Sequence, residues 1–179
     1  MSKETVSTIL ETARLRLREL VPDDLDFMAE MLADADVMRY YPKRLTRDLS
    51  SEWIGRQIER YRTDGHGLWL AEERESGKPI GQVGLVRQTV NGVEECEVGY
   101  LIHRSYWRHG FATEGAIACR DYAFSKLHKP RVVALVRPEN TASQGVARNL
   151  GMEVVGRAPH GGYEHLVFAV RNTSSGPAA

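Results

Sequence analysis

The sequence of 179 residues predicts a single α/β domain of the α+β type, a mixed, mostly antiparallel sheet flanked by helices. The length fits one domain, because domains of ~100–200 residues are the most common. Segments with a period of two residues, typical of strands, alternate with segments that have the helical period. Three strand candidates follow one another directly, as in an antiparallel meander. We place the domain at residues 12–170 and expect flexible termini at 1–11 and 171–179.

The first third of the domain predicts one strand and two helices. Polar and apolar residues alternate over 14–20, which is the pattern of a half-buried strand. Pro22 and the two aspartates after it mark the start of a helix. A second amphipathic helix is expected to start near Ser50 or Ser51 and to end at Gly65.

The middle of the chain predicts the meander, with strands at 67–72, 80–90 and 94–102. Asn91-Gly92, between the last two, is a dipeptide that strongly favours a two-residue hairpin. In the third strand, alternation separates two faces. One face carries Cys96, Val98, Tyr100 and Ile102, and the other carries Glu95, Glu97 and Gly99.

The last third predicts two helices between strands. Small and apolar residues at spacings of three and four predict a helix after Gly110. Asn140 or Thr141 caps the second helix, and Gly151 ends it. The remaining strands are predicted at 131–136, 152–156 and 166–170. The complete order is β-α-α-β-β-β-α-β-α-β-β.

The composition excludes several classes of protein. Lys plus Arg and Asp plus Glu both number 24, so the formal net charge is zero, which argues against a general nucleic-acid binder. Cys96 and Cys119 form no CxxC pair, which excludes a disulfide scaffold and a four-cysteine zinc site. The chain shows no secretion signal and no run of ~20 apolar residues. We therefore expect a cytoplasmic protein that binds neither nucleic acid nor membranes.

The segment 106–114, Tyr-Trp-Arg-His-Gly-Phe-Ala-Thr-Glu, lies between a predicted strand and a predicted helix. Gly110 lets the backbone approach a ligand closely, and the first N–H groups of a helix have no partner within it. Local positive charge comes from His103, Arg104, Arg108 and His109. These features favour an anion site suited to a pyrophosphate. The alternative is an ordinary strand-to-helix turn with solvated basic residues.

Two motifs resemble those of a known family. Val-Gly-Tyr-Leu-Ile at 98–102, followed by Trp-Arg-His-Gly-Phe-Ala-Thr-Glu at 107–114, resembles motif A of the Gcn5-related N-acetyltransferases, or GNAT family. Arg-Pro-Glu-Asn-Thr-Ala-Ser at 137–143, followed by Leu-Gly-Met at 150–152, resembles motif B. The resemblance covers roughly residues 12–170 in the family's order of elements. Within the family, the chain most resembles the ribosomal-protein N-terminal alanine acetyltransferase branch.

Three positions depart from the family's pattern. Trp107 stands at the first position of the pyrophosphate signature, where Gln or Arg is usual, although Trp is common in this branch. Ala147 stands where many relatives carry a Tyr that protonates the departing thiolate. Met152 stands where Phe is commoner, which we interpret as a core substitution.

The resemblance implies that acetyl-CoA is the acetyl donor and binds where the strand ending at Ile102 splays from the strand starting near Arg131. Backbone groups of Leu101 and Ile102 would bind the pantetheine arm and polarise the thioester carbonyl. The pyrophosphate would be held, largely through N–H groups, by Arg108, His109, Gly110, Ala112 and Thr113. Because the family forms no covalent enzyme intermediate, the site has to supply positioning, an oxyanion donor and proton transfers.

Motif B contributes two further candidates. Asn140 in the family contacts the cofactor near its reactive end, although Asn is also well suited to simple helix capping. In the alanine acetyltransferase branch, a serine at the place of Ser143 is thought to donate a proton to the leaving thiolate. The absence of Tyr at Ala147 favours that role, and the alternative for Ser143 is an exposed serine in a first helical turn.

A general base is useful because amines arrive largely protonated, with a pKa of ~7.7–8.0 for an α-amino group and ~10.4 for lysine. Glu97 is the first candidate, since family members with a catalytic glutamate on this strand place it there. The alternative is one more solvated carboxylate in the acidic run 94–97. Glu164 is the rival, because the alanine acetyltransferase branch has an acidic residue thereabouts that faces the acceptor.

Histidines and aromatic residues have plainer interpretations. His160 and His165 straddle two glycines, so no helix presents them together, and the chain contains no HExxH. We expect surface or acceptor-site histidines and no metal. Four aromatic residues are expected to lie in the core or to cover a helix, and some of them to line the acceptor groove: Tyr40, Tyr41, Trp53 and Tyr61.

The sequence leaves more than one function open. The first hypothesis is an acetyl-CoA-dependent N-acetyltransferase that acts on a primary amine, either a protein N-terminus or a small molecule. The alternative is a non-catalytic acyl-CoA-binding module of the same fold. A nucleotide-binding protein is weakly supported, since no GxxxxGK[ST] loop occurs. The partners expected are acetyl-CoA and the amine, and the chain is either a monomer or a homodimer.

Overall fold

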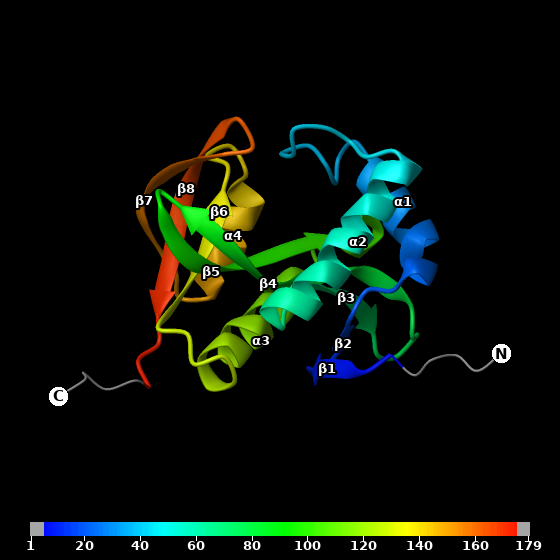
Figure 1. Ribbon diagram of the computed structural model, residues 1–179, viewed down its shortest axis with the longest axis horizontal. Helices are drawn as coiled ribbons and strands as arrows, with labels where there is room; N and C mark the ends of the chain where they lie inside the picture. The colour runs from blue at the N-terminus through cyan, green and yellow to red at the C-terminus, as the bar shows by residue number, and fades with distance from the viewer. Residues whose placement is uncertain (1–5, 175–179) are drawn as a thin grey trace.

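The computed structural model describes residues 6–174, which form one sheet with helices on both of its faces (Figure 1). The strands are β1 (Thr8–Glu11), β2 (Leu15–Arg18), β3 (Leu68–Glu73), β4 (Pro79–Val90), β5 (Val93–Ile102), β6 (Arg131–Val136), β7 (Glu153–His160) and β8 (Tyr163–Arg171). The helices are α1 (Leu25–Ala33), α2 (Arg47–Asp64), α3 (Phe111–Ser125) and α4 (Thr141–Asn149), with short 3₁₀ turns at Pro22–Asp24 and Arg104–Tyr106. The spatial order of the strands is β1-β2-β3-β4-β5-β6-β8-β7.

The predicted mixed, mostly antiparallel sheet is confirmed. Every pair of neighbouring strands in the described chain is antiparallel except β5 and β6. The predicted meander is the run β3-β4-β5, and Asn91-Gly92 makes the turn between its last two strands, with positive φ at both residues. Among residues 6–174, none of the helices has the length and apolar character needed to span a membrane.

The N-terminal expectation was wrong for one segment. Thr8–Glu11, placed in a flexible terminus, forms the edge strand β1 against β2, so the observed order begins with two strands. Its sequence, Thr-Ile-Leu-Glu, does not alternate polar and apolar residues, so no period of two indicated a strand there. Residues 1–5 and 175–179 lie outside the described chain.

Two other boundaries differ from the prediction. Helix α2 begins at Arg47 rather than near Ser50, because the Thr46 side chain caps it by accepting the Leu49 N–H at 3.3 Å. The last hairpin is longer than predicted and turns at Gly161-Gly162. Consequently Arg171, which we assigned to the flexible end, is the last residue of β8.

The two faces of the sheet are covered by different helices. Buried residues of α3 and α4 pack with Leu15, Leu17 and Trp69 in the larger core. Buried residues of α1 and α2 pack with Leu70, the next residue along β3, in a separate core on the opposite face. Figure 1 shows the β7–β8 hairpin at one end of the molecule and β1 and β2 at the other.

The parallel pair β5–β6 is short. The two strands are in register at Glu97 and Val133, and no further pairing follows along β5 to Ile102. Over the same residues β5 stays paired with β4, and β6 is paired with β8 along its whole length. The sheet therefore opens between β5 and β6, where the family resemblance placed the splay.

Candidate active site

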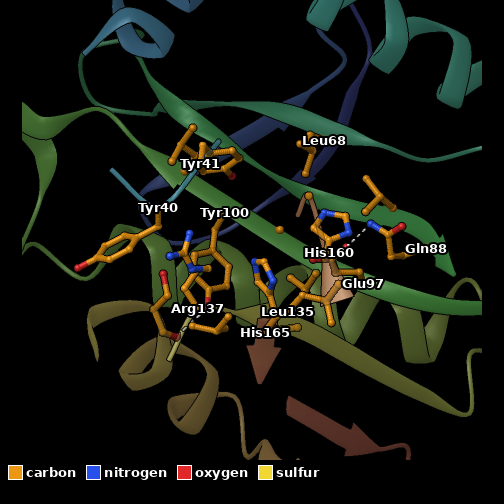
Figure 2. A pocket seen from close by; sticks show the side chains of 18 of the residues that line it. Tyr40, Tyr41, Leu68, Gln88, Glu97, Tyr100, Leu135, Arg137, His160 and His165 are labelled. Carbon is orange, nitrogen blue, oxygen red and sulfur yellow. Dashed lines mark hydrogen bonds between the residues drawn. The ribbon is translucent and has the colours of Figure 1, made fainter. Parts of the chain in front are cut away.

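A cavity of about 360 Å³ lies where β5 and β6 part (Figure 2). This volume is at the lower end of the range usual for small-molecule sites. Its wall includes residues of α2, of the segment 37–42, of strands β4, β5, β6 and β8, and of the start of α4. Elements that are far apart in the sequence therefore contribute to one site.

The cavity connects the two faces of the sheet. Tyr100 packs against the core under α3 and α4, whereas its neighbour Leu101 packs against the core under α1 and α2, as strand alternation requires. Both residues line the cavity, together with Glu97 from the α2 side and Ser143 from the α4 side. A ligand that enters from one face can therefore meet a ligand that enters from the other.

Glu97 is half-buried in the cavity wall and accepts a hydrogen bond from the Gln88 side chain at 3.1 Å (Figure 2). Burial raises the pKa of the Glu97 carboxyl above its ordinary value, because the low-polarity surroundings disfavour the charged form. The hydrogen bond from Gln88 and the charges of His160 and Arg60 oppose this increase of the pKa without cancelling it. The Glu97 carboxyl therefore holds a proton more tightly than an exposed glutamate does.

Two histidines of the last hairpin reach the same cavity. The rings of His160 and His165 meet edge to face with 5.4 Å between their centroids, and Figure 2 shows His160 beside the Gln88–Glu97 hydrogen bond. Burial lowers the pKa of His165, which favours its neutral form. In the described part of the chain, no three His, Cys, Asp or Glu side chains gather into a set that could hold a metal ion.

Glu164 is not brought to the cavity. Its neighbours Tyr163 and His165 line the wall, so alternation along β8 turns Glu164 to the other face. There it is exposed and forms an ion pair with Arg157 of β7. Because β8 extends further than the sequence indicated, the sequence did not reveal which way this carboxylate faces.

Asn140 and Ser143 both line the cavity at the start of α4. The Asn140 side chain accepts the Ser143 N–H at 3.1 Å, so Asn140 is the N-cap. The Ser143 carbonyl accepts a hydrogen bond from the Tyr100 hydroxyl at 2.8 Å, and burial raises the Tyr100 pKa and keeps that hydroxyl protonated. Ala147 is fully buried in the core, away from the cavity wall.

The N-terminus of α3 is open to a ligand. Gly110 precedes the helix with φ of 79°, and Arg108 also has a positive φ of 63°. No side chain caps this end, so N–H groups of the first turn remain available for an anion. Ala112 and Thr113 lie half-buried in this turn, and Arg108 and His109 are exposed beside it. All five residues of the predicted pyrophosphate loop thus surround one helix end.

A network from the loop between β1 and β2 holds the start of α3, and no pattern in the sequence indicated it. The Arg14 guanidinium donates to Glu114 at 2.7 Å and to the His109 carbonyl at 2.8 Å, and lies over the Phe111 ring. Burial raises the pKa of Glu114, but hydrogen bonds from Thr12 and Arg14 lower it more, so the net pKa is below its ordinary value. A spacing of 100 residues between Arg14 and Glu114 leaves no local pattern to detect.

The remaining predicted residues have clear places. Leu101 lines the cavity, whereas the Ile102 side chain lies in the core and its carbonyl accepts the Trp107 indole N–H at 2.7 Å. Met152 is buried, as expected of a core substitution. Among the aromatic candidates Tyr40, Tyr41 and Trp53 line the cavity, but the Tyr61 hydroxyl bonds instead to backbone groups of Leu20 and Leu68.

Comparison with known families agrees with this geometry. Residues 14–153 match the model of the acetyltransferase (GNAT) domain. The chain belongs to the GNAT acetyltransferase family. The protein YkkB of Bacillus subtilis (strain 168) is 35% identical to this GNAT chain over 146 residues, which make up 81% of this chain and 85% of YkkB. The spermidine N(1)-acetyltransferase of Escherichia coli (strain K12) is 29% identical over 82% of this chain and 76% of that enzyme.

Solved structures show the same GNAT fold. An acetyltransferase from Agrobacterium tumefaciens str. C58 matches with a TM-score of 0.80 and 28% identity, over 96% of this chain and 98% of that one. The ribosomal L7/L12 alpha-N-protein acetyltransferase RimL, solved in complex with coenzyme A, matches with a TM-score of 0.75 and 16% identity, over 92% and 98% of the two chains. The relatives include more than one acceptor class, so the ribosomal-protein branch stays a prediction.

The raised pKa of Glu97 predicts a pH-dependent loss of stability. The folded chain holds this proton more tightly than the unfolded chain, whose glutamates have a pKa of ~4.3. The free energy of unfolding should therefore fall as the pH rises from about 4 through the folded pKa. Because Glu97→Gln cannot ionise, the variant should gain stability relative to the wild type as the pH rises, with the largest gain above the folded pKa.

Urea unfolding at pH 4, 6 and 8 measures this difference. Glu153→Gln, at an exposed position on β7, is the matched control and should follow the wild type at every pH. A gap between Glu97→Gln and the wild type that does not change with pH would show that the Glu97 carboxyl titrates alike in the folded and unfolded chains.

Proposed function

We propose that the chain is an acetyl-CoA-dependent N-acetyltransferase that transfers the acetyl group to a primary amine by direct attack. The observation that supports this most is the cavity at the opening between β5 and β6. Glu97 lines this cavity from the α2 side of the sheet, and the start of α4 lines it from the other side. The pKa of the Glu97 carboxyl is raised. The acceptor is either a protein N-terminus or a small-molecule amine.

The residues present fit acetyl-CoA. The uncapped N-terminus of α3 supplies N–H groups for the pyrophosphate, through Arg108, His109, Gly110, Ala112 and Thr113. The opening of the sheet leaves the β6-facing edge of β5 without a strand partner at Leu101 and Ile102, which suits the pantetheine arm, although the Ile102 carbonyl already accepts the Trp107 indole N–H. Asn140, already a helix cap, would contact the cofactor near its reactive end. When bound, acetyl-CoA supplies the acetyl group as an activated thioester.

Glu97 would act as the general base. An amine that enters from the α2 side meets its carboxylate in a half-buried site, where a raised pKa brings the base closer to the pKa of the amine. The hydrogen bond from Gln88 holds the carboxylate in place. Glu97 would take the proton that the amine loses, either directly or through a water molecule.

Ser143 would donate a proton to the leaving thiolate. Its hydroxyl belongs to a cavity-lining residue, and its backbone is fixed by Asn140 on one side and by Tyr100 on the other. The buried Ala147 has no group that could serve instead. Because its backbone is held in place, the Ser143 hydroxyl is suited to donate a proton that is needed mainly in the transition state.

The alternative is a non-catalytic acyl-CoA-binding module of the same fold. The release of free CoA, measured with acetyl-CoA and a panel of peptides and metabolite amines, distinguishes the two. Release that depends on an amine is expected of the enzyme. Binding of acetyl-CoA with no release from any amine would favour the module.

Gly110→Val should weaken acetyl-CoA binding at least tenfold, or about 1.4 kcal/mol. The space around Gly110 would admit a Cβ, since the nearest atom, Arg14 Nη2, would lie at 3.5 Å, but its φ of 79° is one that valine rarely adopts. The helix end would therefore have to shift. Calorimetry of acetyl-CoA binding is the measurement.

The control is Gly92→Val, which places the same residue at a positive φ of 81° in the turn between β4 and β5, outside both the cavity wall and the network around Arg14. This variant should lose stability by a similar mechanism and keep its affinity for acetyl-CoA. If the wild type, Gly110→Val and the control variant all bind acetyl-CoA with equal affinity, Gly110 is not part of the pyrophosphate site.

Glu97→Gln should lower kcat/KM by roughly 10²–10⁴-fold, the usual range for the loss of a general base. The loss should shrink as the pH rises, because more of the amine is then neutral on arrival. Glu164→Gln should stay close to the wild type, since its carboxylate is paired with Arg157 on the other face. Profiles of kcat/KM against pH with one confirmed acceptor test both variants, and a reversed pattern would move the base to the last hairpin.

Ser143→Ala should lower kcat while leaving the affinity for acetyl-CoA nearly unchanged. The Tyr100 and Asn140 contacts are made to the Ser143 backbone, so the substitution should leave them intact. Steady-state kinetics and calorimetry separate the two effects. If kcat is unchanged, water rather than Ser143 protonates the thiolate.

A further inference from the structure

The cavity wall carries more positive than negative charge. Arg56, Arg60 and Arg137 line it, whereas Glu97 is the one carboxylate among its described lining residues. The chain as a whole has a formal net charge of zero, so this excess is local to the cavity. Such an excess attracts an anionic group and repels a ligand that carries several positive charges.

The three arginines differ in how many contacts their guanidinium groups already make within the protein. Arg137 lies over the Tyr163 ring at 3.9 Å and pairs with Glu139 at 3.4 Å. On α2, Arg56 lies over the Trp53 ring at 5.5 Å, and its one ion pair in the described chain is an exposed contact with Glu52 at 4.0 Å, which holds a guanidinium weakly. The half-buried Arg60 donates to the Gln57 amide oxygen at 3.3 Å and forms no ion pair within the described chain. Arg60 and Arg56 therefore keep donors for a ligand.

The Gln57 side chain gives a second, independent indication. Its oxygen accepts from the Leu68 N–H at 3.0 Å and from Arg60, and these two donors fix the orientation of the amide. The amide nitrogen, Nε2, is then buried with no acceptor within hydrogen-bond distance, although Gln57 belongs to the cavity wall. Buried donors normally have partners. This part of the wall thus has donors in excess and lacks an acceptor oxygen.

A carboxylate or phosphate matches these donors. A guanidinium forms paired hydrogen bonds with two oxygens of such a group, which gives both affinity and orientation. Residues four apart lie on the same side of a helix, so Arg56 and Arg60 face one ligand together. The charge of Arg60 also acts on Glu97, so the oxyanion site lies within electrostatic range of the general base.

We propose that the acceptor is a small primary amine that also carries an oxyanion, and that Arg60, supported by Arg56 and Gln57, binds this oxyanion while the amino group lies at Glu97. Amino acids and amino phosphates are the two chemical sources of such a molecule. The cavity of about 360 Å³ suits a small acceptor, and Tyr40, Tyr41 and Trp53 supply apolar surface for its carbon skeleton. The inference rests on the proposed function, because it names the acceptor of that site.

Binding of matched amines to the CoA-saturated protein tests the oxyanion site without turnover. The carboxylate probes are L-phenylalanine against L-phenylalaninamide and β-alanine against propylamine. The phosphate probe is O-phosphoethanolamine against ethanolamine, and spermidine serves as the polycation. Calorimetry should show at least tenfold tighter binding of the anionic member in at least one pair, and the pair that responds identifies the source.

Arg60→Gln should abolish that preference and leave the affinity for the pair member without an oxyanion within about twofold. The two members of a pair differ in the pKa of the amino group. This difference cancels when the affinity ratio of the pair in the wild type is compared with the same ratio in the variant. Arg62→Gln is the matched control: it lies on the same helix, pairs with the exposed Glu59 and is not among the cavity residues. It should keep the wild-type preference.

Turnover with the same panel separates this inference from the proposed function. If anionic amines bind through Arg60 but none releases CoA from acetyl-CoA, the oxyanion site stands and the proposed function fails. If amines without an oxyanion, or spermidine, are acetylated with no preference for the members that carry one, the function stands and the inference is overturned. Equal binding within every pair, or a preference that survives in Arg60→Gln, also overturns it.

Discussion

The pairing of Glu97 with Val133 is the point at which the sheet stops being continuous, and the site depends on it. Beyond this pair, β5 stays hydrogen-bonded to β4 and β6 to β8, so each half of the sheet remains internally satisfied. The opening therefore exists in the folded chain and needs no local unfolding. It creates the cavity and leaves the side of residues 98–102 that faces β6 open to a ligand, which an unbroken parallel sheet could not do.

The same opening brings residues from the two faces of the sheet into one cavity. Strand alternation sends Glu97 toward α2 and Tyr100 toward α4, and only a gap in the sheet allows a ligand to contact both sides. Partial burial at the bottom of the gap raises the Glu97 pKa, so the protonation of this carboxyl depends on the shape of the sheet. The stability lost when this carboxyl ionises is a local cost of holding a titratable group inside the fold.

The proposed acetyl-CoA site includes the first turns of α3 and α4. Contacts from other parts of the chain hold both of these turns in place. Arg14 and Thr12 fix the start of α3 through Glu114, and Tyr100 fixes the start of α4 through the Ser143 carbonyl. Helix N-termini that must stay open for a ligand cannot be stabilised by a full set of caps. Tertiary contacts at the flanks keep these ends rigid, and the N–H groups at the start of α3 remain uncapped.

The sequence alone determined features that depend on near neighbours. Alternation along 94–102 assigned Glu97 and Tyr100 to opposite faces, Asn140 was recognised as a possible helix cap, and Gly110 as the residue before α3. The tertiary structure decided which faces meet. It turned Glu164 away from the cavity and brought Arg60 and Ser143 to one wall although they are far apart in the chain. Periodicity shows which side of an element is buried, but the partner across a cavity is set by packing between elements, which no local pattern records.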